Sequence, residues 1–170
     1  MNEKSKYYIE KLQLKPHPEG GYYCETYRSE EKLSPSALPD RYEGERCWST
    51  AIYFLIDGGQ KSTFHKLKSD EIWHYYDGSS VRVYLIDEKG KLQVKFLGQN
   101  IDEGENFQVV IRSGLWFAAE VIDKDSFSLY GCTVSPGFEF QDFQLGKRSQ
   151  LIREFPHLTE LIIRFTNPGE

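Results

Sequence analysis

A histidine and a glutamate, His65 and Glu71, are the residues of this chain whose types and spacing best suit chemistry. They lie in two short β-type runs, 60–66 and 71–77, joined by a polar turn. A hairpin there would place both side chains on one face, because strand side chains alternate. An imidazole beside a carboxylate can bind a divalent metal or act as an acid/base pair. The alternative is a hydrogen-bonded couple without a chemical role, since buried polar groups need partners in any case.

Strand alternation also selects the other residues that would face such a pocket. The residues that share a face with His65 or Glu71 by this rule, and that we expect to bind a ligand, are Lys61, Thr63, Trp73 and Tyr75. His74 is at an odd offset from Glu71, which predicts an outward side chain unless a β-bulge shifts the register.

Evenly spaced β-type runs fill most of the chain. The runs are 22–28, 48–57, 60–66, 71–77, 80–87, 91–97, 107–112, 115–122, 127–134 and 138–145. Turn signals such as Asp57-Gly58-Gly59 lie between them, and this pattern predicts an antiparallel barrel or jelly roll. A helical pattern covers residues 4–13, and two more follow Gly146, divided by Pro156.

Length and composition narrow the class of protein. With 170 residues we expect one domain, 1–170, with a barrel core at about 47–145. The net charge of −5 with mixed signs argues against a nucleic-acid surface. The three cysteines are an odd number without framework spacing, and no apolar leader or membrane-length run is present, so we expect a cytoplasmic protein. The 11 Tyr, 11 Phe and 3 Trp suit both a ring-filled barrel and a pocket that stacks on a small molecule.

Two further segments carry expectations. The segment His17-Pro18-Glu19-Gly20-Gly21 is interpreted as a rigid entry turn, the alternative being that Glu19 reaches over the mouth of the barrel. The run 50–56 is apolar on both faces, so its outer face needs cover from a terminal helix or from a second subunit.

The spacing of these residues resembles the first motif of the cupin superfamily, G-x5-H-x-H-x3,4-E-x6-G. Gly59, His65, Glu71 and Gly78 match it, while Leu67 stands at the second histidine. The second motif, G-x5-P-x-G-x2-H-x3-N, is degraded around 112–117. Phe117 stands at its metal-binding histidine and would shape the pocket wall. Two of the four metal ligands of a metal cupin therefore remain, His65 and Glu71, which is few for a tightly held metal.

Three longer segments resemble one group, the small single-domain cupins labelled cupin_5 or domain of unknown function. They are 15–23, 64–74 and 131–143, in the same order, and the resemblance runs from about residue 12 to residue 165. It implies a double-stranded β-helix, and the sheet-to-sheet pairing common in such cupins implies a homodimer.

The resemblance leaves three functions open. The first is an isomerase or epimerase acting on a carbohydrate-like or nucleotide-sugar substrate, as in sugar-epimerase cupins. His65 would then be the base, Glu71 would orient it, and Tyr130 would be a proton donor, with no redox cofactor and no metal. The second is a non-catalytic protein that binds a small ligand. The third is a metal-dependent cupin enzyme, with a divalent metal on His65 and Glu71.

Overall fold

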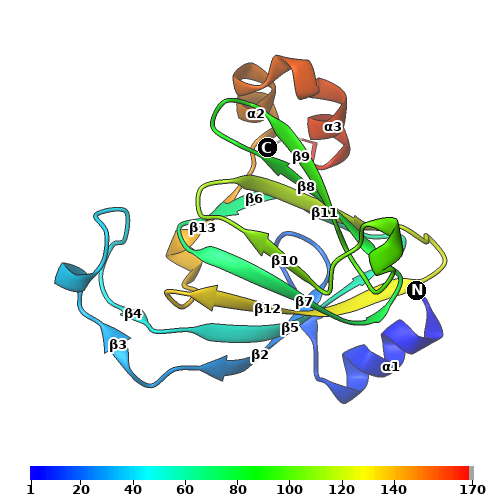
Figure 1. Cartoon of the computed structure of the whole chain (residues 1–170), viewed down its shortest axis with the longest axis horizontal. Coiled ribbons are helices and arrows are strands. Elements are labelled where there is room, and N and C mark those ends of the chain that lie inside the picture. The colour runs from blue at the N-terminus through cyan, green and yellow to red at the C-terminus, as the bar shows by residue number, and fades with distance from the viewer. Residues whose placement is uncertain (169–170) are drawn as a thin grey trace.

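The computed structural model describes residues 1–168, and most of its strands form two antiparallel sheets that face each other (Figure 1). The six-stranded sheet contains, in spatial order, β1 (Lys15–Pro16), β2 (Tyr22–Arg28), β5 (Thr50–Asp57), β12 (Phe127–Ser135), β7 (Asp70–Gly78) and β10 (Gln108–Ile111). The five-stranded sheet contains β13 (Phe143–Leu145), β6 (Lys61–Leu67), β11 (Trp116–Val121), β8 (Val81–Ile86) and β9 (Leu92–Leu97). The all-β jelly-roll class predicted from the even strand spacing is confirmed.

The main core lies between the two sheets, where alternate residues of each strand point inward. Its largest buried side chains include Phe54, Trp73, Phe117 and Tyr130. Trp73 stacks on Tyr130 with the ring centroids 4.6 Å apart, and Phe54 stacks on Tyr130 at 5.3 Å. This ring stack forms a rigid floor beneath the candidate site described below.

Short helices cover part of each outer face (Figure 1). Helix α1 (Glu3–Lys11) lies against the six-stranded sheet, where Leu14, Leu55 and Phe127 share a buried cluster. Helices α2 (Arg148–Glu154) and α3 (Thr159–Arg164) cover the five-stranded sheet through a second cluster. That cluster includes Phe64, Trp116, Leu151, Phe155, Ile162 and Phe165. No helix within residues 1–168 is long and apolar enough to span a membrane.

The segment 29–47 forms an arm at the left of Figure 1 with a two-stranded sheet, β3 (Lys32–Leu33) and β4 (Arg46–Cys47). Arg46 is buried and donates to both carboxylate oxygens of Asp142, at 2.6 and 2.7 Å. Asp142 belongs to the 3-10 turn η3 (Phe140–Asp142), so the strand predicted over 138–145 is limited to β13. The buried ion pair therefore fixes the arm to the segment that precedes β13.

Two register shifts change which residues share a face. In β6, His65 lies opposite Phe117 of β11 while Ser62 lies opposite Ala119, so β6 carries one extra residue. In β7, Asp77 lies opposite Leu129 of β12 while Tyr75 lies opposite Tyr130. Such bulges reverse the alternation on one side of the extra residue.

Candidate functional site

A cavity of about 240 Å³ lies between the sheets, and buried polar groups are concentrated in its wall. Its polar and titratable lining includes His17, Glu19, His65, Glu71 and Cys132. Its aromatic lining is Tyr23, Phe54, Trp73, Phe138, Phe140 and Phe143. The cavity therefore combines proton-exchanging groups with ring surfaces that suit a small, partly apolar ligand.

Glu19 is the partner of His65. His65 Nε2 lies 3.0 Å from Glu19 Oε2, and His65 Nδ1 lies 2.7 Å from the carbonyl oxygen of Thr63. Ser62 Oγ donates to the other carboxylate oxygen of Glu19 at 2.7 Å. All of these groups are buried. Both ring nitrogens of His65 thus face hydrogen-bond acceptors, which favours the doubly protonated imidazolium.

In the pair of His65 and Glu19, each charge stabilises the other. Burial alone would lower the pKa of His65, but the adjacent Glu19 carboxylate and the Thr63 carbonyl reverse the effect and raise it. Burial alone would raise the pKa of Glu19, but the His65 charge and the Ser62 hydroxyl hold it below the ordinary value. At neutral pH the two residues therefore form a buried ion pair.

A second imidazole, that of His17, lies beside the same carboxylate. His17 Nδ1 is 3.3 Å from Glu19 Oε2, and the His17 ring packs edge-on against Tyr23 at 4.7 Å. Burial is the main influence on His17 and lowers its pKa despite the neighbouring charge of Glu19. His17 is therefore neutral at neutral pH.

Glu71 is the titratable carboxyl of the cavity that lacks an ion-pair partner among residues 1–168. Burial and the nearby negative charge of Glu19 raise its pKa to about 7, and the positive charge of His65 offsets this only in part. The Trp73 indole and the Cys132 thiol approach the carboxyl group and also lower its pKa. Trp73 Nε1 nevertheless has no hydrogen-bond partner of ordinary geometry among the described residues. Glu71 is consequently close to half protonated at neutral pH.

The predicted site residues fall into two groups. His65, Glu71 and Trp73 line the cavity. Phe117 packs behind the His65 ring at 3.9 Å, and Tyr130 is fully buried beneath Trp73. Neither is among the cavity-lining residues, and burial raises the pKa of the Tyr130 phenol well above 10. The expectations that Phe117 shapes the wall and that Tyr130 donates a proton to a ligand are therefore not supported by this geometry.

Three more predicted ligand-binding residues, Lys61, Thr63 and Tyr75, are not among the cavity-lining residues, although Tyr75 keeps the predicted face of Glu71 and Trp73. Thr63 donates its hydroxyl to the Glu19 carbonyl, and together with Lys61 it lines a separate hollow. The extra residue in β6 separates both from the face of His65, so the parity rule gave the wrong face there. Tyr75 packs against the core and donates to the Gly78 carbonyl at 2.6 Å, beyond the end of the cavity. His74 bonds to Thr133 and Gln108, away from the cavity lining, as its odd offset predicted.

The entry segment, residues 17–21, places His17 and Glu19 in the cavity wall. The interpretation of this segment as a rigid entry turn did not predict that position. Gly20 and Gly21 have φ values of 108° and 73°, which favour glycine. A Cβ on Gly20 would lie 2.2 Å from the Lys61 carbonyl oxygen, so the segment approaches β6 as only glycine permits. The Glu19 carbonyl then accepts the Thr63 amide at 2.8 Å. The sequence feature that could have indicated the position of Glu19 is an acidic residue directly before two glycines.

The fold and the cavity define a small double-sheet β-barrel protein with a buried acid/imidazole site. The model of the Cupin superfamily (DUF985) matches residues 6–146, and the chain belongs to this family. The uncharacterized protein YML079W of Saccharomyces cerevisiae is 29% identical over 143 residues, covering 79% of this chain and 71% of the yeast protein.

Solved structures show the same fold. Protein SO0799 from Shewanella oneidensis is 35% identical with a TM-score of 0.88, covering 99% of both chains. A hypothetical protein from Leishmania major is 30% identical with a TM-score of 0.85, covering 95% of this chain and 97% of that one. Bacillus subtilis oxalate decarboxylase, a structure described for its Mn(II) centers, shares the fold at 17% identity and a TM-score of 0.54. This match covers 94% of this chain and 38% of the decarboxylase chain.

The metal implied by the wider superfamily does not fit the residues as they are arranged here. Within residues 1–168 no group of three or more His, Cys, Asp or Glu side chains converges as metal ligands do. His65 Nε2 faces Glu19, whose carboxylate also has His17 and Ser62 as neighbours. We therefore derive no chemical step through a metal.

Proposed function

We propose that the cavity binds a small molecule bearing a carbonyl or similar oxygen and that Glu71 transfers a proton to or from it. The reaction class is an isomerisation or epimerisation, in which a proton leaves a carbon next to the carbonyl and returns. The observation that supports this is a buried carboxyl group of pKa about 7 that faces the cavity without an ion-pair partner among residues 1–168. A group of that pKa serves both as base and as acid near neutral pH.

In this proposal the residues near Glu71 have separate tasks. His65 is engaged at both nitrogens, so it acts as a fixed positive charge that stabilises the negative charge developing on the ligand. Glu19 is a positioning residue that holds His65 as an imidazolium. The Trp73 indole N–H is a buried donor without a partner among the described residues, and it would bind the ligand oxygen. The base is thus Glu71, in place of the His65 expected from the sequence.

Hydrogen–deuterium exchange tests this reaction class without knowledge of the natural substrate. Keto sugars and small hydroxy ketones would be incubated with the protein in D2O and followed by proton NMR. We expect the wild-type protein to exchange a C–H proton next to the carbonyl of at least one compound. Glu71→Gln should lose this exchange, while Glu103→Gln on the surface should keep it. Equal exchange by wild type and Glu71→Gln would refute the role of Glu71.

The second candidate is a binding protein without turnover, favoured by the six aromatic residues in the cavity wall. Native mass spectrometry of the purified protein would reveal a ligand that copurifies. A ligand recovered unchanged, together with an absence of exchange in any tested carbonyl compound, would select this alternative.

The homodimer is also part of this proposal. Helix α1 covers one part of the six-stranded sheet, whereas Tyr76 on the same outer face is half exposed and packs edge-on against Tyr53 at 5.9 Å. A second copy placed on this face would bury both rings. Sedimentation at micromolar concentration should report a dimer, and Tyr76→Glu should dissociate it. A wild-type monomer would contradict the proposal.

A further inference from the structure

A second hollow lies on the far side of the entry segment from the cavity, and it is strongly basic. Its charged lining consists of Lys61, Lys124 and Arg164 together with the carboxylates Glu19 and Glu120. We call this the basic hollow. Because Glu19 is paired with His65, the hollow carries three positive charges against one remaining negative charge.

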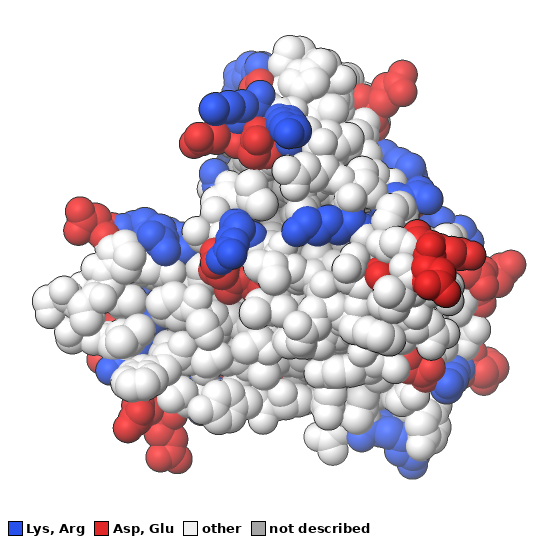
Figure 2. All heavy atoms as spheres, in the orientation of Figure 1, with Lys and Arg blue, Asp and Glu red and all other residues white. Residues whose placement is uncertain are grey.

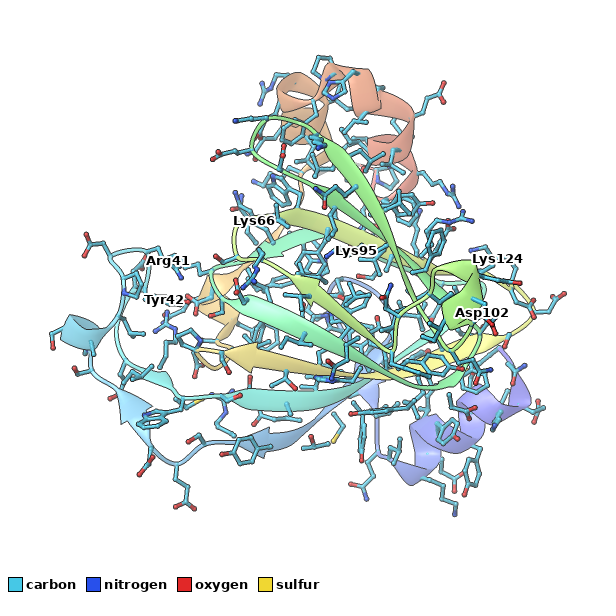
Figure 3. The ribbon with its side chains drawn as sticks, in the orientation of Figure 1. Arg41, Tyr42, Lys66, Lys95, Asp102 and Lys124 are labelled. Carbon is cyan, nitrogen blue, oxygen red and sulfur yellow. The ribbon has the colours of Figure 1, made fainter. Side chains whose placement is uncertain are left out.

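Glu120 is surrounded by more cations than it can neutralise. It is buried and accepts from Lys124 Nζ at 2.9 Å, from Arg164 and from the Tyr84 hydroxyl, while Arg82 lies 3.6 Å away. Figure 2 shows Lys and Arg side chains at the right-hand edge of the molecule below the C-terminal helices, on the side where Figure 3 labels Lys124 in the connection between β11 and β12. One carboxylate thus faces three cationic side chains, and the excess charge is positive.

Lys61 adds to this excess. Its Nζ donates to the Arg164 carbonyl oxygen, and no carboxylate within residues 1–168 forms an ion pair with it. Burial and the positive charges of Arg148 and Arg164 lower the pKa of Lys61, which Glu120 offsets only in part. Arg148 itself donates to Thr166 and to the Ile163 carbonyl, with no acidic partner among the described residues. An anion placed here would relieve repulsion among these cations.

Glycines form much of the remaining wall of the basic hollow. Gly20, Gly21, Gly58 and Gly59 line it; an added Cβ at the first three would meet protein backbone within 2.7 Å, so Gly59 is the one of these four where a ligand can approach the backbone closely. An added Cβ at Gly59 meets no heavy atom of residues 1–168 within 4 Å, so the hollow is open at this point. Gln60 and Asn167 supply side-chain amides on the same wall. Such a combination of cations, amides and bare backbone suits a phosphate group.

We propose that the basic hollow binds a dianionic phosphate group, held by Lys61, Lys124 and Arg164. The hollow shares His17 and Glu19 with the cavity of Glu71, but the three cations that would hold the phosphate line the hollow and not the cavity, so this site does not depend on the proposed function. The same chemistry would serve inorganic phosphate and the phosphate of an organic monoester, and the two are distinguished by the measurement below.

Titration calorimetry of the full chain with inorganic phosphate and with phenyl phosphate tests the site. We expect one phosphate per chain and a loss of affinity of about tenfold in Lys61→Gln, because a charge-assisted contact is removed. Gly59→Asp should weaken binding at least as much, since it adds a negative charge in open space. Lys89→Gln, in the turn between β8 and β9, is the control and should bind like wild type. Circular dichroism would establish that each variant is folded.

The outcomes separate clearly. Tighter binding of phenyl phosphate than of inorganic phosphate would assign the site to an organic phosphate, and equal binding would assign it to the free ion; both support the proposal. Absence of phosphate binding would overturn it, as would an equal loss in Lys89→Gln and Lys61→Gln. Wild-type affinity in a folded Gly59→Asp variant would also overturn it.

Discussion

The replacement of Glu71 by glutamine gives the most direct test of the electrostatics of the cavity, because it needs no substrate. Glutamine keeps the shape of the side chain and cannot ionise. In the wild-type protein the pKa of Glu71 rises from 4.5 to about 7 on folding. The folded state therefore binds the proton more tightly than the unfolded state does. The stabilisation from this bound proton is complete below pH 4.5 and is lost as the pH rises through 7.

The size of this effect follows from the same two values. A shift from 4.5 to about 7 corresponds to a loss of about 3 kcal/mol at high pH. Less than a third of this is already lost at pH 5, so roughly 2 to 3 kcal/mol remains to be lost between pH 5 and pH 9. The Glu71→Gln variant does not lose stability in this way, because glutamine cannot ionise. Its free energy of unfolding relative to wild type should therefore increase by roughly 2 to 3 kcal/mol over that range.

Urea unfolding at pH 5, 7 and 9 measures this difference, and all other titrating groups contribute equally to both proteins to first order. Glu103→Gln, which removes an exposed carboxylate outside the cavity, serves as the matched control. A constant difference between Glu71→Gln and wild type from pH 5 to pH 9 would refute the reasoning. So would an NMR titration that gives the Glu71 carboxyl a pKa near 4.5.

Three further changes test other parts of the structure. Glu19→Gln should lower the pKa of His65, because burial then acts without the opposing charge of that carboxylate, and NMR titration of the ring protons measures the change. Gly78→Ala should destabilise the protein by about 2 kcal/mol in urea unfolding, because the φ of Gly78 is 97° and an added Cβ would lie 2.2 Å from a carbonyl oxygen. The control Gly59→Ala, where an added Cβ meets no atom, should change stability by less than about 1 kcal/mol. Arg46→Ala leaves the buried Asp142 carboxylate with only Lys68, 3.8 Å away, as a cationic partner and should cost about 3 kcal/mol in the same assay; a much smaller loss would argue that the arm opens to water.

The sequence predicted the features that depend on local patterns. The alternation and the turn residues located β2 with its bounds and most other strands to within about two residues. The spacing of His65 and Glu71 placed both in one cavity wall, as the lining residues show. These features were accessible because a strand records its buried face in every second residue.

The remaining features depend on long-range geometry. The contact of Glu19 with His65 requires the backbone of Gly20 to pass against β6, and no local pattern encodes which strand a glycine turn will meet. The bulge in β6 places Thr63 on a different face from His65. The sequence of β6 gives no sign of the extra residue, because its side chains alternate regularly. The strand predicted to begin at residue 138 failed because Asp142 turns toward Arg46, which lies 96 positions away in the sequence.

The two carboxylates of the cavity explain why the assignment of chemical roles changed once the contacts were known. Glu19 has a hydroxyl donor and an imidazolium as partners, so it stays ionised although it is buried. Glu71 shares the same low-dielectric space without such partners, and the charge of Glu19 adds to the cost of ionising it. Two acids with different surroundings thus differ in protonation at one pH, and the partly protonated one, Glu71, is available for proton transfer. From spacing alone, His65 and Glu71 form the pair. The geometry instead pairs His65 with Glu19 and leaves Glu71 as the group that can exchange a proton with a ligand.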